Sequence, residues 1–130
     1  MINTFICLLT TVILMFTAVE SEAQDNIAYQ DEQVRITVVT DGVVRLEWEA
    51  TGKFTDSPSF VAAERNYPAT DFKVSKKGKE VRIETSRMTV SYKMNSGKFT
   101  KNNLEIKAAD GFFTWKPGMQ QKENLKGTFR

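Results

Sequence analysis

Two carboxylates stand two residues apart, in a stretch where apolar and polar side chains alternate. Glu47 and Glu49 flank Trp48, and residues two apart in an extended strand point to the same face. A carboxylate pair can hydrolyse a glycosidic bond when one member is held protonated and the other ionised. Nothing nearby in the sequence would desolvate either group, so we expect two solvated charges on the wet face of a strand.

An aromatic cluster near the end of the chain is a candidate contact surface. Phe112, Phe113 and Trp115 follow a turn at Asp110-Gly111. Alternation predicts that Phe113 and Trp115 share one face while Phe112 lies on the other. Exposed aromatic rings stack on sugars or cover a neighbouring domain. Burial in the core or contact with another domain is favoured for these rings over direct ligand stacking.

Residues 51–70 form a connection long enough to suggest a function. Its stretch Asp56-Ser57-Pro58-Ser59-Phe60 is typical of a turn or the start of a short helix, because Asp or Ser caps and Pro sets φ. Arg65-Asn66-Tyr67 offers polar and aromatic groups to a ligand, although a docked loop is the simpler interpretation. We expect the connection to be held down by its apolar anchors: Phe54, Phe60, Val61 and Tyr67.

Composition excludes several kinds of site. The chain has no histidine and one cysteine, Cys7, which rules out His-based triads and His-ligated zinc. We find no glycine-rich phosphate loop, acidic metal cluster or nucleophile elbow, and therefore expect no catalytic residue, no metal and no cofactor. The formal charge of +2 is mild and no basic stripe is visible, so we expect no nucleic-acid partner.

The first 23 residues are predicted to be a helical secretory signal peptide. Ile2 to Val19 holds no charged residue, and Ser21-Glu22-Ala23 has the small-x-small pattern of a cleavage site before Gln24. A retained membrane anchor is the alternative, since about 18 apolar residues can cross a bilayer. After cleavage we expect no membrane association. An exported domain without cysteine suits a bacterial periplasm or cell surface.

The stretch from Val34 to Glu49 predicts a β-hairpin. Apolar residues alternate with polar ones on both sides of Asp41-Gly42, and this dipeptide is a strong turn signal because Gly accepts a positive φ. The hairpin should have one buried face and one wet face. Trp48 falls on the buried side, so we expect it in the core.

The remaining sequence contains further short alternating runs separated by turn residues roughly every 8–12 positions. No helical period of useful length follows the signal. These features are typical of an all-β fold, an antiparallel β-sandwich or barrel, over residues 24–130. The further predicted strands are Ile27–Tyr29, Phe72–Ser75, Val81–Thr85, Met88–Met94, Leu104–Lys107 and Phe112–Trp115.

The order of these pieces resembles the N-terminal domain of glycoside hydrolase family 31, the α-glucosidase and α-xylosidase family. The likeness covers about residues 33–130. The stretches that carry it are Arg35–Trp48, Gly52–Phe60, Arg87–Tyr92, Phe113–Gly118 and Asn124-Leu125-Lys126-Gly127-Thr128-Phe129-Arg130.

The resemblance implies a galactose-mutarotase-like β-sandwich, incomplete at its C-terminal end. In the family it precedes a catalytic (β/α)8 barrel with two aspartates, and none of the barrel's motifs has a counterpart here. The parent protein would be a retaining α-glycosidase, and this chain would be its non-catalytic N-terminal fragment. Its partner would be the barrel, whose substrate pocket it would help to shape, and the resemblance assigns no substrate-binding residue. The alternatives are a free-standing carbohydrate-binding module and an envelope interaction domain.

Overall fold

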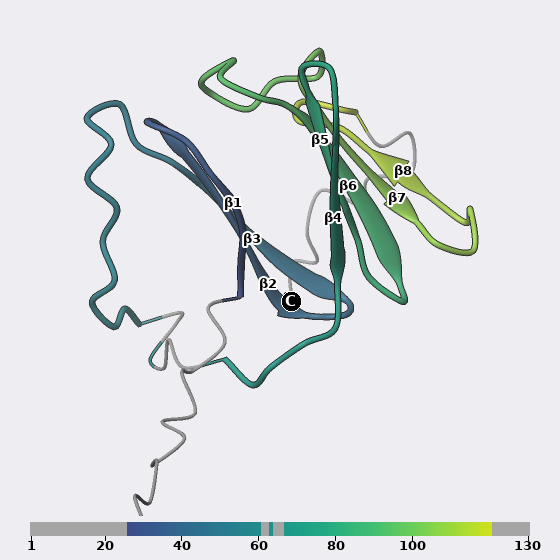
Figure 1. Ribbon diagram of the computed structural model, residues 1–130, viewed down its shortest axis with the longest axis horizontal. Helices are drawn as coiled ribbons and strands as arrows, with labels where there is room; N and C mark the ends of the chain where they lie inside the picture. The colour runs from purple at the N-terminus through teal and green to yellow at the C-terminus, as the bar shows by residue number, and fades with distance from the viewer. Residues whose placement is uncertain (1–25, 61–62, 64–66, 121–130) are drawn as a thin grey trace, which may run out of the picture.

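The computed structural model describes residues 26–60, 63 and 67–120. This part of the chain contains strands and no helix, as the alternation predicted, and the strands form two antiparallel sheets (Figure 1). The strands are β1 (Ile27–Gln30), β2 (Val34–Thr40), β3 (Val43–Trp48), β4 (Lys73–Lys77), β5 (Glu80–Glu84), β6 (Met88–Lys93), β7 (Leu104–Ala108) and β8 (Thr114–Trp115).

The first sheet has the order β1-β2-β3 and contains the predicted hairpin. Ile36 pairs with Leu46 and Val38 with Val44, and the register shifts by one residue before Thr40 pairs with Val43. The turn at Asp41-Gly42 is confirmed, but Gly42 is not among the positive-φ residues. The expected positive φ is therefore wrong for Gly42. A side chain at Gly42 would instead approach Cδ of Arg87 at 3.4 Å.

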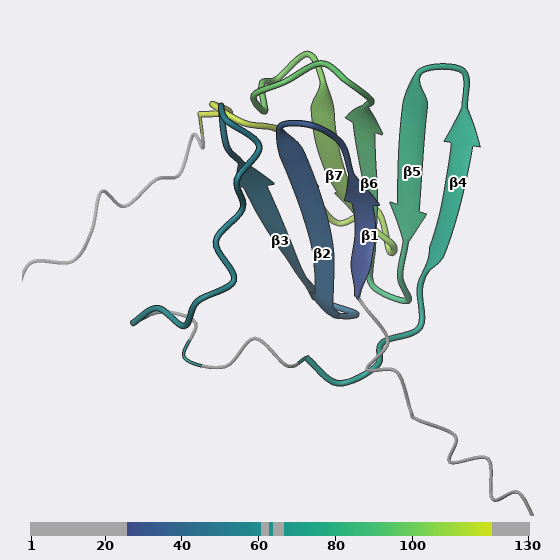
Figure 2. The same ribbon diagram turned by 60° about the vertical axis from the view of Figure 1, so that its left-hand side comes forward.

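The second sheet is a meander of five strands in the order β4-β5-β6-β7-β8. Its outer strand β4 is exposed along its whole length, and Figure 2 shows it to one side of the first sheet. Three of the five residues of β4 are lysines, which suits an edge strand because charged side chains discourage pairing with another chain.

The two sheets face each other across one apolar core (Figure 2). Tyr92 is fully buried in this core, with its ring centroid 5.6 Å from that of Tyr29 and 5.4 Å from that of Phe99. Alternation explains most of the set, because every second residue of β2, β5 and β6 points inward. The core residues are Tyr29, Val34, Ile36, Val38, Val81, Ile83, Met88, Val90, Tyr92 and Leu104.

Polar contacts also join the two sheets at both ends. Asp31 Oδ2, after β1, accepts the backbone N–H of Asn95 at 3.2 Å. At the other end the carbonyl of Asp41 accepts the Thr85 hydroxyl at 2.6 Å, and Asp41 Oδ2 accepts the Ser86 hydroxyl at 2.8 Å. These bonds link turns that lie more than 40 residues apart in the sequence, so they help to hold one sheet in register over the other.

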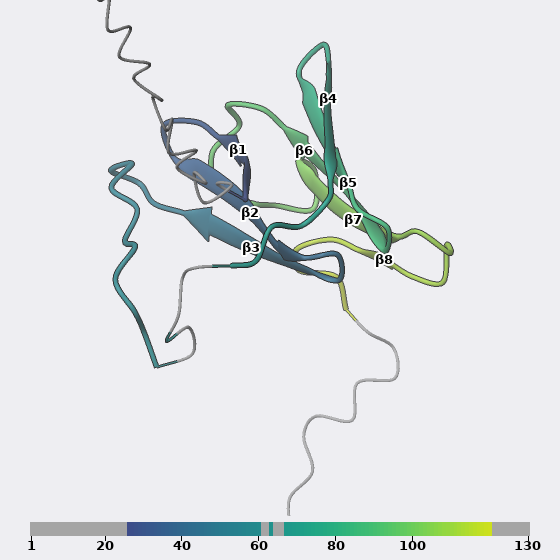
Figure 3. The ribbon, with the colours of Figure 1, turned by 60° about the horizontal axis from the view of Figure 1, so that its bottom comes forward.

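The hairpin does not have the simple wet face that its sequence predicted. Arg35 and Thr37, on the side of β2 opposite the core, are only 6% and 7% exposed. The connection after β3 covers this face: Figure 3 shows it on the side of the first sheet away from β4–β8. The predicted wet face is therefore absent from β2, which is buried on both sides.

Several predictions concern residues outside the described part of the chain. They are the signal peptide over 1–23, the Asn124–Arg130 passage, and the candidates Val61, Arg65 and Asn66. Within the described residues, no helix has the length and apolar character needed to cross a bilayer.

Candidate functional site

Glu47 and Glu49 do not form an acid pair. Glu47 Oε2 accepts Arg35 Nε at 2.7 Å, and its Oε1 accepts Nη2 of Arg35 and Nη2 of Arg45. Glu49 Oε1 accepts the backbone N–H and the hydroxyl of Thr51, both at 3.1 Å. Each carboxylate is therefore engaged in a structural contact. The expectation of two solvated charges is wrong for Glu47, whose side chain is only 14% exposed because Arg35 and Arg45 pack against it.

Arg35 is the centre of the covered face of the first sheet. Its guanidinium also donates to Asp56 Oδ1 at 2.6 Å and lies 4.8 Å from the ring centroid of Phe54. Hydrogen bonding to Glu47 raises the pKa of Arg35 despite burial, and hydrogen bonding to Arg35 lowers the pKa of Asp56. Arg35 thus ties the start of the long connection to β2.

Only part of the 51–70 connection is held down as predicted. Phe54 is half-buried beside Arg35, and Tyr67 is half-buried further along. Phe60, predicted to be an anchor, is fully exposed. The prediction was wrong for Phe60 because no described element lies over that part of the connection.

Trp48 is not in the core. It is 40% exposed at the end of β3, which is an edge strand of its sheet, and the ammonium of Lys98 lies 5.2 Å from its ring centroid. Alternation placed Trp48 on the inward side, but an edge position leaves one side of the ring without a neighbouring strand. Lys98 occupies part of the space over the ring.

The aromatic cluster divides between the core and the surface. Trp115 pairs with Ile106 and packs against the core, whereas Phe112 and Phe113 are 89% and 49% exposed. Phe113 differs from Trp115 in exposure because it precedes β8, which begins only at Thr114.

Phe112 and Phe113 line a groove of about 430 Å³ at one end of the molecule. We call this groove the apolar end. Three turns meet there, because the hairpin turn, the β5–β6 turn and the β7–β8 turn each contribute lining residues. Val43, 51% exposed, follows the hairpin turn. The lining residues are Gly42, Ser86, Arg87, Met88, Ala108, Ala109, Asp110, Phe112 and Phe113.

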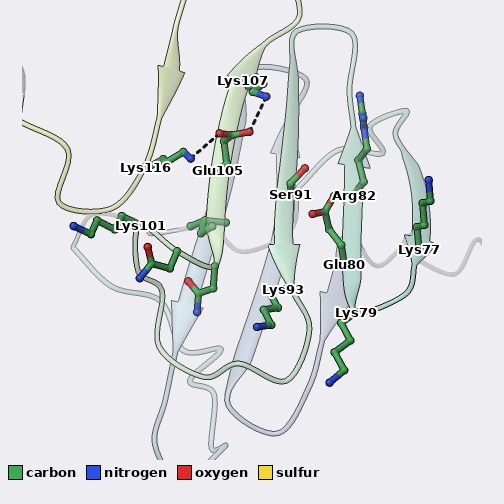
Figure 4. A pocket seen from close by; sticks show the side chains of 13 residues that line it. Lys77, Lys79, Glu80, Arg82, Ser91, Lys93, Lys101, Glu105, Lys107 and Lys116 are labelled. Atoms are coloured by element: carbon green, nitrogen blue, oxygen red, sulfur yellow. Dashed lines mark ion pairs between the residues drawn. The ribbon is translucent and has the colours of Figure 1, made fainter.

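A second and larger concavity, of about 540 Å³, lies on the outer face of the five-stranded sheet (Figure 4). We call it the basic trough. Figure 4 shows Ser91 and Glu80 near its middle, with lysine side chains around them. Its lining residues are Lys77, Lys79, Glu80, Arg82, Ser91, Lys93, Lys101, Asn102, Asn103, Leu104, Glu105, Lys107 and Lys116.

Ion pairs in the basic trough leave an excess of positive charge. Glu105 binds Lys107 at 2.8 Å and Lys116 at 3.0 Å, and hydrogen bonds from these two lysines lower the pKa of Glu105. Glu80 pairs in the strand register with Lys77 on one side and Lys93 on the other. Seven basic and two acidic residues line the trough, so an anionic group would be attracted to it.

Sequence reasoning missed the basic trough for a geometric reason. Its lysines come from three strands, β4, β6 and β7, and from three connecting segments, so no run of basic residues is visible in the chain. The available signal was the outward-facing position in each alternating run, such as Arg82, Ser91 and Lys93. Only the order of the strands in the sheet shows which of these outward-facing residues lie next to one another.

Among the described residues, no group of three acidic side chains is placed to hold a metal ion. Comparison with known proteins adds no identification, since neither a protein-family model nor a curated protein sequence matches the chain.

Proposed function

We propose that this chain is the non-catalytic N-terminal β-sandwich domain of an exported α-glycoside hydrolase of family 31, with a galactose-mutarotase-like fold. Residues 1–23 would direct its export to the periplasm or cell surface of a bacterium. Its role would be to support the (β/α)8 barrel that acts on carbohydrate.

The apolar end is the observation that supports this proposal best. Phe112, Phe113 and Val43 expose apolar surface around one groove, and clustered apolar surface of this kind is typical of a contact with another domain or protein. Part of the resemblance to family 31, the stretch that begins at Phe113, lies in this region. A neighbouring barrel would bury these side chains.

Hydrolysis by the purified chain is the direct test. We expect no turnover of nitrophenyl α-glucoside or α-xyloside, because Glu47 is engaged by Arg35 and Arg45 and leaves no free acid pair with Glu49. Turnover that persists through purification would contradict the proposal.

A second test concerns the apolar end. The isolated chain should self-associate in light scattering and bind an apolar dye, because the barrel that would cover Phe112 and Phe113 is not present. The double variant F112S/F113S should remain monodisperse, with its melting temperature unchanged, since both rings lie outside the core.

Phe60→Ser provides the control, because Phe60 is also an exposed phenylalanine but lies in the connection after β3, away from the groove. F60S should associate like the unmodified chain. An unmodified chain that is monodisperse and does not bind the dye would contradict a covered apolar end. That result would favour the alternative, a free-standing carbohydrate-binding module, which the basic trough supports.

A further inference from the structure

We propose that the basic trough binds a linear polysaccharide of acidic sugars, whose units each carry a carboxylate beside free hydroxyl groups. This inference does not depend on the family or on the apolar end, because the trough lies on the outer face of the five-stranded sheet rather than at the groove lined by Phe112 and Phe113.

The positive charge needed for carboxylate binding is present and available. Lys77, Lys79, Lys93 and Lys101 make no ion pair with another described residue, unlike Lys107 and Lys116, which share Glu105. Figure 4 shows Lys79 and Lys93 side by side at one end of the trough and Lys101 at its flank. These ammonium groups can each receive a ligand carboxylate without breaking an existing pair.

The middle of the trough suits hydroxyl groups. The side chains of Ser91, Glu80 and Asn102 have no hydrogen bond to another described residue. A hydroxyl donor and a carboxylate acceptor are therefore free in the middle of the trough, and an amide is free beside Lys101. A ligand with negative charge alone would meet Glu80 unfavourably. A sugar acid can place its hydroxyls against Glu80 and its carboxylates toward the lysines, so both kinds of group are matched.

The same lining disfavours other ligands. None of the described residues that line the trough is aromatic, so it has no platform on which the bases of a single-stranded nucleic acid would stack. Nor can a neutral sugar ring stack there. The trough extends across several strands of an open sheet face, which fits an extended polymer better than an enclosed small molecule.

Binding of the full chain to polygalacturonate, measured by calorimetry and affinity electrophoresis, tests the proposal. We expect binding at low ionic strength that weakens as salt is added, because exposed charges are screened. Dextran, which is neutral, and fully methyl-esterified galacturonan, whose carboxylates are masked, should not bind.

Two charge-matched double variants locate the site. K79Q/K93Q removes two free lysines from the trough and should raise the dissociation constant for polygalacturonate about tenfold. K73Q/K76Q removes the same charge from β4 at positions that do not line the trough, and should change it by less than about twofold. Both variants should melt like the unmodified chain, since these lysines are exposed.

Three results would overturn the proposal. An absence of heat and of electrophoretic retardation with polygalacturonate at low salt would remove it. Equal losses in the two double variants would show attraction by net charge alone. Binding of a single-stranded oligonucleotide or of polyglutamate as tight as that of polygalacturonate would show a surface for polyanions in general. None of these results would bear on the hydrolysis test.

Discussion

At the scale of single residues, Arg35 shows how one polar side chain can be satisfied inside an all-β domain. Its side chain is 8% exposed, and its guanidinium contacts the carboxylates of Glu47 and Asp56 and the ring of Phe54. Breaking a buried ion pair by removing one partner is strongly destabilising, because the other charge is left uncompensated. The two carboxylates differ, however, since Glu47 is 14% exposed and Asp56 is 72% exposed.

We expect Arg35→Ala to lower the free energy of unfolding by about 3 kcal/mol, because Glu47 loses its main partner. Asp56→Asn, the control at the exposed partner, should cost less than about 1 kcal/mol. Urea denaturation followed by circular dichroism measures both. Similar losses in the two variants would show that Glu47 does not carry the interaction.

Asp31 is the second residue whose environment predicts a measurable effect. Partial burial alone would raise the pKa of Asp31, but hydrogen bonds from Gln33, Tyr29, Val34 and Asn95 lower it below its ordinary value of 3.8. Burial and the neighbouring Asp31 also raise the pKa of Tyr29 to about 12. The ionised form of Asp31 therefore stabilises the fold.

Asp31→Asn should lower stability by about 2 kcal/mol at neutral pH, the range for hydrogen bonds to a charged group. Because the pKa of Asp31 is lower in the folded chain, its contribution is present above about pH 4 and is lost as the pH falls through the folded value. The difference in unfolding free energy between the two proteins should shrink as the pH is lowered from about 4 into the acid range. A constant difference over this range would contradict the assignment.

At the scale of elements, the turns after β3 and β4 contrast in how strongly they require glycine. Gly52 has a φ of +70°, and a Cβ there would lie 2.3 Å from the carbonyl oxygen of Glu32. Gly78, between β4 and β5, has a φ of +58° and open space around it. Both glycines adopt the left-handed backbone conformation, but only at Gly52 does a neighbouring backbone segment leave no room for a side chain.

Substitution by alanine separates these two effects. Gly78→Ala should cost about 1 kcal/mol, the penalty of a left-handed conformation for a residue with a side chain. Gly52→Ala should cost at least about 2 kcal/mol more, because the backbone at Glu32 must move. Thermal unfolding of the two variants tests this order, and equal melting temperatures would contradict it.

At the scale of the whole molecule, the two sheets share one core and should unfold together. Ile83, fully buried in β5, packs in the same cluster as Ile36 and Val38 of β2. Each sheet also carries its own fluorescent reporter, Trp48 on β3 and Trp115 on β8. A shared core predicts that both reporters follow a single transition.

Single-tryptophan variants W48F and W115F should therefore show the same denaturant midpoint by fluorescence and by circular dichroism within each protein. Adding Ile83→Ala to either should lower stability by about 2–5 kcal/mol and shift both reporters equally, although Trp48 lies on the other sheet. Two separate transitions would show that the sheets are independent units.

The amino-acid sequence by itself determined the local structure of this protein. The alternating runs predicted the strands from β2 to β8 to within a few residues, and Asp41-Gly42 and Asp110-Gly111 marked turns that are present. Such features depend on neighbours in the chain: side chains alternate in any extended strand, and turn residues act on their own backbone.

Only the tertiary structure decided which faces are covered and which charges meet. It buried Arg35 under residues 54–56, left Trp48 at a sheet edge, and exposed Phe112 and Phe113 in a turn. It also gathered lysines from separate strands into the basic trough. Burial and electrostatic potential depend on the order in which strands lie side by side and on what packs over them, and alternation within one strand carries no information about either.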